Sequence, residues 1–489
     1  MDRPWGAVTD RCTVTVTITR SVVPGVMRNV VLCCLDSVRA DVFAAVADRL
    51  RDRAELRYDG CRAASSWSAP SYASMLTGRL PHDHGVTTHD PSLASVEPSE
   101  TFLADLDGYG LAGVSTNVFA GSAFGFDRFF DRFVDVTEAT RFPEGLDPAA
   151  FRSDRDGLRA YPAYLRAALA HDRPAASLAN GAVGLLDTLS EGAPVPKLFD
   201  DGATAVIREG RRAVERTGEP FFLFTTFMEA HTPLRHVRGF DRALHDAPRG
   251  FTTDERSVWE LMDATDEHAE FLRHRRGLYA AAVDYLDRTL VPFVDRLVAE
   301  TDRETTVVIT ADHGENQGYP WEEGRVRHKS SLSEGLLHVP LLVVNPPAGY
   351  PAVESGYVSQ LELGRLLVAF ARGETIDPTA DRIVAEHAGM SAGPEPPDSR
   401  AYWDRLMRAA YEDDRKVVWD SLGGVAAYEL DRSRPCWQRR LDGEATVPEW
   451  ARDRFRGDAV GTKRRLVESS RRRDVDAPVR ERLEKLGYV

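Results

Sequence analysis

The sequence predicts an α/β fold, with a mostly parallel central sheet sandwiched by helices and a small C-terminal α+β subdomain. Short, continuously apolar segments of strand length recur along the chain, and such runs are typical of parallel strands that are buried on both faces. Amphipathic helical segments alternate with these runs, which is the pattern of repeated βα units. The chain has 489 residues, of which 43% are hydrophobic, so it can bury a large core.

The predicted elements begin with a strand at residues 29–35 (NVVLCCL) and an amphipathic helix at 40–52. Further strands are expected at 113–116, 221–227, 306–310 and 339–344, with helices at 203–218 and 277–300 between them. Two stretches, 138–200 and 246–271, interrupt the pattern with polar residues and turn formers. Insertions of this kind commonly surround the mouth of a binding site.

Three segments are expected along the chain. Residues 1–27 are interpreted as an N-terminal extension, either disordered or lying upstream of a translation start at Met27. Residues 28–375 form the main domain, and residues 376–489 form the small C-terminal subdomain and tail. In that tail, a Pro/Gly-rich stretch precedes the segments RKVVWDS and GGVAAYEL, which predict a small hairpin.

Composition and charge argue against several classes of protein. The formal net charge of −14 and the pI near 5.5 disfavour binding to nucleic acid. No run of about 18 apolar residues occurs, so stable membrane insertion is not expected. The five cysteines include no CxxC pair, which disfavours a disulfide framework or a cysteine-ligated zinc. These features fit a reducing compartment, and we expect a cytoplasmic protein.

Polar residues that could carry chemistry follow three of the predicted strands. Asp36 comes directly after the first strand, Asp312 and His313 follow another, and His231 lies beyond a third. Functional groups of open α/β sheets gather at the carboxyl ends of strands. With the hydroxyl of Ser68, two carboxylates and an imidazole could hold one divalent cation, which would lower the hydroxyl pKa and neutralise an anionic ester.

Each of these residues also has a purely structural interpretation. Ser68 precedes an apolar segment with Pro70 near its start, as the cap of a helix would. An Asp after a strand often caps a helix, and Asp-His-Gly often forms a turn. The combination of all of them, rather than any single residue, favours a site.

The order of these motifs and the residues within them resemble the sulfatase family of the alkaline-phosphatase superfamily over about residues 28–350. The resemblance implies that Asp36, Asp312 and His313 are metal ligands and that Ser68, in SAPSYASMLTG, is the nucleophile and a fourth ligand. His231, in MEAHTPL, corresponds to the substrate-facing histidine. The position of Lys329 matches the family's ester-binding lysine. Beside these motif positions, His328 is a candidate catalytic group or a loop residue, Asn117 is a candidate polar contact of unassigned role toward substrate, and Arg39 either contacts substrate or braces the turn after Asp36.

The sequence departs from the family pattern at three positions. Tyr72 stands where the nucleophile motif has an arginine, so conversion of Ser68 to formylglycine is not expected. Ser37 replaces the usual second Asp of the first motif, and His313 replaces a common Asn. The resulting set is similar to phosphoglycerol transferase-type members that use an unmodified Ser or Thr. Oxygen ligands favour Ca²⁺ or Mg²⁺, and the imidazole adds Mn²⁺ or Zn²⁺ to the choices.

The resemblance implies a sulfatase-family, metal-dependent hydrolase of sulfate esters, with a small-molecule, glycan or lipid-headgroup ester as substrate. His231 or His328 would protonate the leaving alcohol and Lys329 would stabilise charge on the ester oxygens. A phosphoester hydrolase or a phosphoglycerol-type transferase is the alternative on the same metal and serine site. A non-catalytic binding homologue is a third possibility.

Overall fold

The computed structural model of the protein describes residues 27–137, 140–148, 161–190, 195–390, 395–455, 457–470 and 476–486. Except for Met27, the expected N-terminal extension lies outside the described residues. The main sheet has nine strands in the order β11-β10-β2-β9-β6-β1-β5-β3-β4. Its strands are β1 (Asn29–Leu35), β2 (Leu56–Arg62), β3 (Gly110–Ser115), β4 (Arg132–Asp135), β5 (Phe221–Phe227), β6 (Thr305–Thr310), β9 (Leu341–Val344), β10 (Val353–Ser359) and β11 (Thr379–Ala380).

The centre of this sheet is parallel, as predicted. Strand β1 lies between β6 and β5 and runs parallel to both, and β3 and β4 continue the parallel array. All residues of β1, β5 and β6 are buried, because helices cover both faces of the sheet. Strand β9 pairs antiparallel with its two neighbours, which makes the sheet mixed. The predicted α/β fold class is therefore confirmed.

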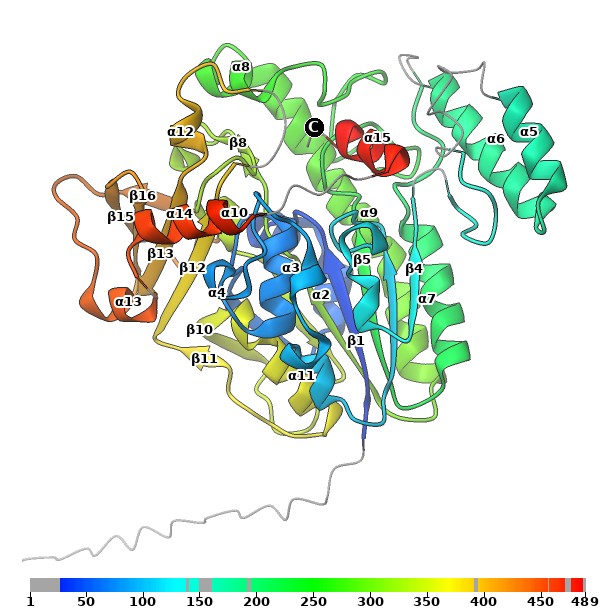
Figure 1. The fold of residues 1–489 in the computed structure, drawn as a ribbon, viewed down its shortest axis with the longest axis horizontal. Helices are drawn as coiled ribbons and strands as arrows, with labels where there is room; N and C mark the ends of the chain where they lie inside the picture. Colours follow the sequence, from blue (N-terminus) through cyan, green and yellow to red (C-terminus); the bar gives the residue numbers. More distant parts are fainter. Residues whose placement is uncertain are drawn as a thin grey trace, which may run out of the picture.

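Helices form a layer on each side of the sheet (Figure 1). Helices α1, α2, α7 and α9 pack together on one face, whereas α3 and α11 pack on the other. The helices of the described residues are α1 (Ala40–Val46), α2 (Asp48–Arg53), α3 (Ser68–Thr77), α4 (Pro81–His84), α5 (Tyr161–Ala170), α6 (Pro174–Ser190), α7 (Ala203–Thr217), α8 (Val258–Asp263), α9 (Ala269–Glu300), α10 (Glu334–Leu337), α11 (Leu363–Ala371), α12 (Arg400–Trp403), α13 (Glu449–Arg454), α14 (Ala459–Ser469) and α15 (Ala477–Lys485).

The single helix expected at 40–52 is two helices, broken at Ala47. The break turns the first amides of α2 toward α9. There the carboxylate of Asp287 accepts hydrogen bonds from the backbone N–H of Leu50 at 2.7 Å and of Arg49 at 3.2 Å. A long-range partner thus caps the second helix, and nothing in the local sequence indicates this partner.

The C-terminal region contains a separate antiparallel sheet (Figure 1). The predicted hairpin is confirmed as β14 (Arg415–Asp420) and β15 (Val425–Leu430), and it lies within five strands that also include β12 (Arg382–Ala388), β13 (Leu406–Glu412) and β16 (Gln438–Arg440). Strands β12 and β13 were not predicted. Each carries a charged residue in its buried part, and Glu386 and Arg408 compensate each other across the two strands at 2.8 Å.

A buried carboxylate joins this small sheet to the main domain. Glu334, at the start of α10, accepts hydrogen bonds from Arg62 at 2.9 Å, Lys416 at 2.9 Å and Tyr411 at 2.7 Å. Burial alone would raise the pKa of Glu334, but Arg62 and Lys416 lower it to about 2. The carboxylate is therefore ionised and contacts both sheets.

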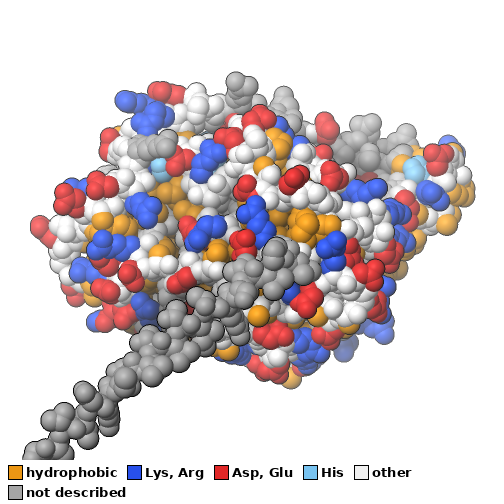
Figure 2. All heavy atoms as spheres, turned by 90° about the horizontal axis from the view of Figure 1, so that it is seen from below, with side chains coloured by type: hydrophobic (Ala, Val, Ile, Leu, Met, Phe, Trp, Pro, Cys, Tyr) orange, Lys and Arg blue, Asp and Glu red, His pale blue; other side chains and the backbone are white. Residues whose placement is uncertain are grey.

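Acidic and basic side chains are interspersed on the face seen in Figure 2, with hydrophobic side chains between them. This face carries no continuous basic surface, in keeping with the net charge of −14. None of the helices in the described part of the chain is long and apolar enough to cross a membrane.

Candidate active site

Two carboxylates meet at the carboxyl ends of β1 and β6. The strands are adjacent and parallel, with Cys34 opposite Thr310, so the residues that follow them lie at the same edge of the sheet. Ser37 adopts a left-handed conformation with φ of 61°, which turns the chain sharply after β1. Its backbone N–H donates to Asp312 Oδ1 at 3.2 Å, and its hydroxyl donates to Asp36 Oδ1 at 2.7 Å.

Ser68 faces this pair from the first residue of α3. Its Oγ lies 3.4 Å from Asp36 Oδ2 and 3.3 Å from His313 Nε2, and the side chain is fully buried. The N-cap residue of α3 is Trp67, and no side chain caps the helix. The capping interpretation of Ser68 is therefore wrong, because its hydroxyl is directed to the acidic cluster and not to the helix amides.

The cluster fits a cation. Asp36, Asp312 and His313 are buried, and one ligand atom from each lies within 4.8 Å of the others. Burial raises the pKa of both Asp36 and Asp312, because the charged forms lose their hydration. Asp312 Oδ2 is buried without a hydrogen-bond partner. Adjacent buried carboxylates with an unsatisfied oxygen are costly unless a positive charge compensates them, so these residues could hold one divalent ion.

His313 is oriented for such a role by its own backbone. Its Nδ1 lies 2.7 Å from the carbonyl oxygen of Gly314. A carbonyl can only accept a hydrogen bond, so Nδ1 donates to it and Nε2 is the ring nitrogen that faces Ser68. Fixing the imidazole through its second nitrogen is typical of histidines that bind metals.

Asn117, a residue of unassigned role in the sequence, contacts both Asp36 and Ser68. Its Nδ2 donates to Asp36 Oδ2 and lies 3.3 Å from Ser68 Oγ. Its Oδ1 accepts from the backbone N–H of Phe119 at 2.7 Å and of Ala120 at 3.3 Å. Because the backbone holds the oxygen, the amide NH₂ group must face the cluster, where it positions the carboxylate and the hydroxyl.

Three histidines lie together beside the cluster. The ring of His328 is 5.0 Å from that of His313 and 5.3 Å from that of His231. Burial lowers the pKa of His328 to about 3 and that of His231 to about 4, so both imidazoles are neutral at pH 7. Thus the structure brings together the two histidines that the sequence analysis selected as candidate acids.

The sequence analysis missed Glu315, which holds His328. Its Oε2 lies 2.8 Å from His328 Nδ1, and its Oε1 accepts from Arg275 at 2.6 Å. Burial alone would raise the pKa of Glu315, but His328 and Arg275 lower it to about 2. An ionised carboxylate only accepts, so Nδ1 of His328 carries the proton. The signal in the sequence was the position of Glu315, two residues after His313.

Lys329 is buried next to His328, with 4% of its surface exposed. Burial and, to a smaller extent, Arg327 lower its pKa to about 8, while Glu315 acts in the opposite direction. A desolvated ammonium of this kind interacts strongly with an anion, because little water screens it. The position fits the ester-binding role expected for this lysine, which stays a prediction.

Arg39 is engaged with its own chain. Its guanidinium donates to both oxygens of Asp41 at 2.8 and 2.7 Å, to Glu322 and to the carbonyl oxygen of Glu315 at 2.9 Å. These bonds brace the turn after β1 and the backbone of Glu315. The expected contact of Arg39 with substrate stays a prediction.

Tyr72 stands at one departure from the family pattern. Its side chain is buried and forms edge contacts with Phe126 and Phe224, at 5.8 and 6.0 Å between ring centroids. Burial raises the pKa of its hydroxyl, and the nearby Asp312 and Asp36 raise it further. The ring therefore packs in the apolar core, while the hydroxyl lies near the two carboxylates.

The chain is a hydrolase, because a family model of such enzymes matches most of it. The family model described as Sulfatase matches residues 28–372, and the chain belongs to the sulfatase family. A search of the curated proteins found no match.

Three solved structures illustrate the likeness of fold. The phosphonate monoester hydrolase of Agrobacterium radiobacter is 16% identical with a TM-score of 0.54, over 82% of this chain and 89% of that one. The phosphonate monoester hydrolase from Silicibacter pomeroyi is also 16% identical, with a TM-score of 0.55 over the same shares. BT4656, solved in complex with its substrate D-glucosamine-2-N,6-O-disulfate, is 13% identical with a TM-score of 0.53, over 83% and 91%.

Proposed function

We propose that the protein hydrolyses sulfate esters of small molecules or glycans, with Ser68 as the nucleophile. The observation that carries the proposal is the position of Ser68 Oγ, 3.4 Å from Asp36 and 3.3 Å from His313. Asp36, Asp312 and His313 would hold one divalent cation together with Ser68. That cation, of the Ca²⁺, Mg²⁺, Mn²⁺ or Zn²⁺ kind, would lower the pKa of the serine hydroxyl and offset the charge of the ester.

The chain's own residues supply the remaining steps. Ser68 Oγ attacks the sulfur, and Lys329 stabilises the charge on the ester oxygens. His328 or His231, each neutral at pH 7, takes up the proton that Ser68 loses and gives it to the leaving alcohol. The contact with Glu315 at 2.8 Å favours His328, because a carboxylate at Nδ1 stabilises the imidazolium through which the proton passes. Water then releases the sulfate from Ser68.

The second candidate is the hydrolysis or transfer of phosphate esters on the same residues. Tyr72 favours it, since an aromatic residue stands where the motif for formylglycine formation has arginine. An unmodified serine forms a phosphoester that water or an acceptor alcohol can release. If the cluster binds no ion, the third possibility, a non-catalytic binding homologue, would remain.

A paired assay separates these proposals. The purified protein, titrated with each metal, is given an aryl sulfate and the matching aryl phosphate mono- and diesters, with Ser68→Ala as control. We expect the protein to release sulfate and Ser68→Ala to release none. The mass of the peptide that contains Ser68 should be that of an unmodified serine. Turnover of phosphates alone would establish the second candidate. No turnover of either ester with any metal would refute both enzymatic proposals.

We also propose that the protein acts in a reducing compartment such as the cytoplasm. Cys33, Cys34, Cys61 and Cys436 are buried free thiols in the described part of the chain. Burial raises the pKa of Cys33 and of Cys61 to about 12, so these thiols stay protonated. Immunolocalisation or fractionation of cells that produce the protein tests this assignment.

A further inference from the structure

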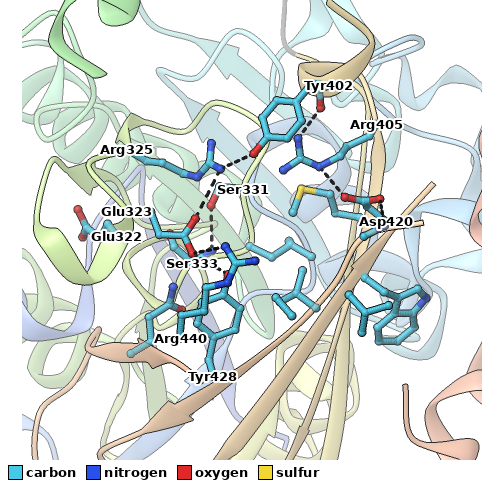
Figure 3. A pocket seen from close by; sticks show the side chains of 18 residues that line it. Glu322, Glu323, Arg325, Ser331, Ser333, Tyr402, Arg405, Asp420, Tyr428 and Arg440 are labelled. Carbon is cyan, nitrogen blue, oxygen red and sulfur yellow. Dashed lines mark hydrogen bonds and ion pairs between the residues drawn. The ribbon is translucent and has the colours of Figure 1, made fainter. Parts of the chain in front are cut away.

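A second cavity lies at the seam between the two sheets, apart from the Ser68 cluster (Figure 3). One wall is the main-domain segment 322–333, and the other comes from strands β13 to β16 and from α12. Its volume is about 230 Å³. We call this cavity the seam pocket. Among the described residues, those that line the seam pocket include none that is assigned above to the metal or the ester.

Arginines dominate the polar rim of the seam pocket. Figure 3 shows Arg325 and Arg405 on either side of Tyr402 and Arg440 at the other end of the pocket beside Tyr428, with Glu323 between Arg325 and Arg440. Arg325 donates to the hydroxyl of Tyr402 at 2.9 Å, and the guanidinium of Arg405 stacks over the same ring at 3.8 Å. Glu323 lies 3.8 Å from Arg325 and 3.7 Å from Arg440. One carboxylate therefore faces two guanidinium groups at distances longer than those of a good ion pair.

The remaining charges leave this rim positive. Asp420 pairs with Arg405 at 3.1 Å. Glu322 also lines the pocket, but its carboxylate forms an ion pair with Arg39. Three arginines thus share two carboxylates. Burial alone would raise the pKa of Tyr402, yet Arg325 and Arg405 lower it below its ordinary value. This is the response expected of an acid in a positive potential.

The floor of the seam pocket is apolar. Leu332, Met407 and Val418 line it and are each at least 90% buried. Pockets for drug-sized ligands measure roughly 300–1,000 Å³, so a cavity of about 230 Å³ suits a smaller molecule. A guest that satisfies both surfaces has an anionic group for the rim and a nonpolar face for the floor and the Tyr402 ring.

We propose that the seam pocket binds a monosaccharide-sized organic anion, such as a uronate or a sugar sulfate. The anionic group accepts hydrogen bonds from N–H groups of Arg325 and Arg440 that Glu323 does not engage, and the C–H face of the ring lies over Leu332 and Met407. Guanidinium groups bind carboxylate and sulfate oxygens through paired hydrogen bonds, which gives the site its selectivity for anions. The inference is independent of the proposed function, since it concerns binding and involves none of the residues around Ser68.

Strand β16 provides a matched control for the test. Successive residues of a strand point to opposite faces, and Arg440 lines the pocket whereas Arg439 pairs with Glu429 at 2.8 Å. Their side chains are similarly exposed, at 63% and 62%. Arg440→Gln and Arg439→Gln therefore each remove one positive charge from β16. The first removes it from the face that lines the pocket, and the second removes it from the opposite face.

Calorimetric titration of the full-length protein with sodium glucuronate tests the proposal. We expect binding that Arg440→Gln and Arg325→Gln each weaken by about tenfold, as the loss of a charge-assisted hydrogen bond implies. Arg439→Gln should bind as the unchanged protein does. Arg440 is a rim residue, so its variant should keep the circular dichroism spectrum and thermal midpoint even if Arg325→Gln is destabilised.

Two further ligands define what the pocket recognises. Neutral glucose should not bind, and inorganic sulfate should bind more weakly than glucuronate because it has no nonpolar face. The proposal is overturned if glucuronate does not bind, if Arg440→Gln and Arg439→Gln bind it equally, or if glucose or sulfate binds as tightly as glucuronate.

Discussion

Ser68 Oγ lies 3.4 Å from Asp36 Oδ2, although 32 positions separate the two residues in the chain. Asp36 directly follows β1 in the middle of the sheet, and Ser68 begins α3 on one of its faces. A hydroxyl at the first residue of a helix lies in the positive end of the helix dipole. This placement favours a serine alkoxide, which is the form that the proposed nucleophile needs in order to act without modification of the side chain.

Replacing Ser68 by alanine should abolish turnover and leave the fold intact. Loss of the attacking atom lowers kcat by roughly 10³-fold or more. Because Trp67 rather than Ser68 is the N-cap, the free energy of unfolding should change by less than about 1 kcal/mol. Steady-state kinetics measure kcat, and urea unfolding measures the free energy of unfolding. Ser74→Ala removes another hydroxyl of α3, one that is hydrogen-bonded to His84, and should keep full turnover. A comparable loss of turnover in both variants would contradict the role of Ser68 as nucleophile.

Asn117→Ala should weaken metal binding. Its amide holds Asp36 in place, and loss of such an outer partner costs roughly 10- to 100-fold in metal affinity. Calorimetric titration of the metal-stripped protein with each divalent ion gives the dissociation constants. Asn180→Ala, which removes a buried amide that donates to Phe142 O at 2.9 Å, is the control. Equal affinities of Asn117→Ala and the unchanged protein would show that Asn117 does not support the ligand.

Glu315→Gln should affect leaving groups unequally. The glutamine fills the same space but cannot stabilise a protonated His328, so esters of poorly acidic alcohols should lose roughly 10²-fold in kcat. Esters of acidic phenols, which leave without a proton, should lose little. Comparing an alkyl with a nitrophenyl ester measures the difference. A uniform loss with both esters would indicate that Glu315 has only a structural role.

Acid should destabilise the junction between the two sheets through Glu334. Its pKa falls from 4.5 to about 2 on folding. A carboxyl group whose pKa is depressed in the folded state contributes stability that is fully present above pH 4.5 and is lost as the pH falls toward 2. Urea unfolding at pH 7, 5, 4 and 3 should show this loss.

The variant Glu334→Gln isolates that contribution. At pH 7 it leaves Arg62 and Lys416 without their buried carboxylate, which costs roughly 3–5 kcal/mol. Its stability should then fall less steeply below pH 4.5 than that of the unchanged protein. Parallel acid profiles of the two proteins would show that another group is responsible.

Where burial alone shapes an element, the sequence was a sufficient guide. The strand predicted at 29–35 is β1 and the one predicted at 221–227 is β5, with the same bounds. Both lie in the sheet centre, where each residue needs an apolar neighbour on either face. The break at Ala47 was unpredictable, because the partner of the amides beyond it is Asp287, far away in α9.

Strands of the C-terminal sheet and the role of Glu315 in the site were not predictable from the sequence, because the partners of their charged residues are also distant in the chain. Glu386 and Arg408 look like surface residues until β12 and β13 pair and bring their charges to 2.8 Å. Glu315 looks like any polar residue of a turn until Arg275 and His328 enclose it.

The sequence by itself determined the buried central strands, the family and the residues that follow those strands, since these depend on local apolar runs and short motifs. Only the tertiary structure decided that Ser68 faces Asp36 rather than the helix amides, that Glu315 holds His328, and that Arg325, Arg405 and Arg440 line one pocket. Each of these arrangements compensates a buried or concentrated charge with a distant residue, and electrostatic pairing across a fold leaves no periodic trace in the sequence.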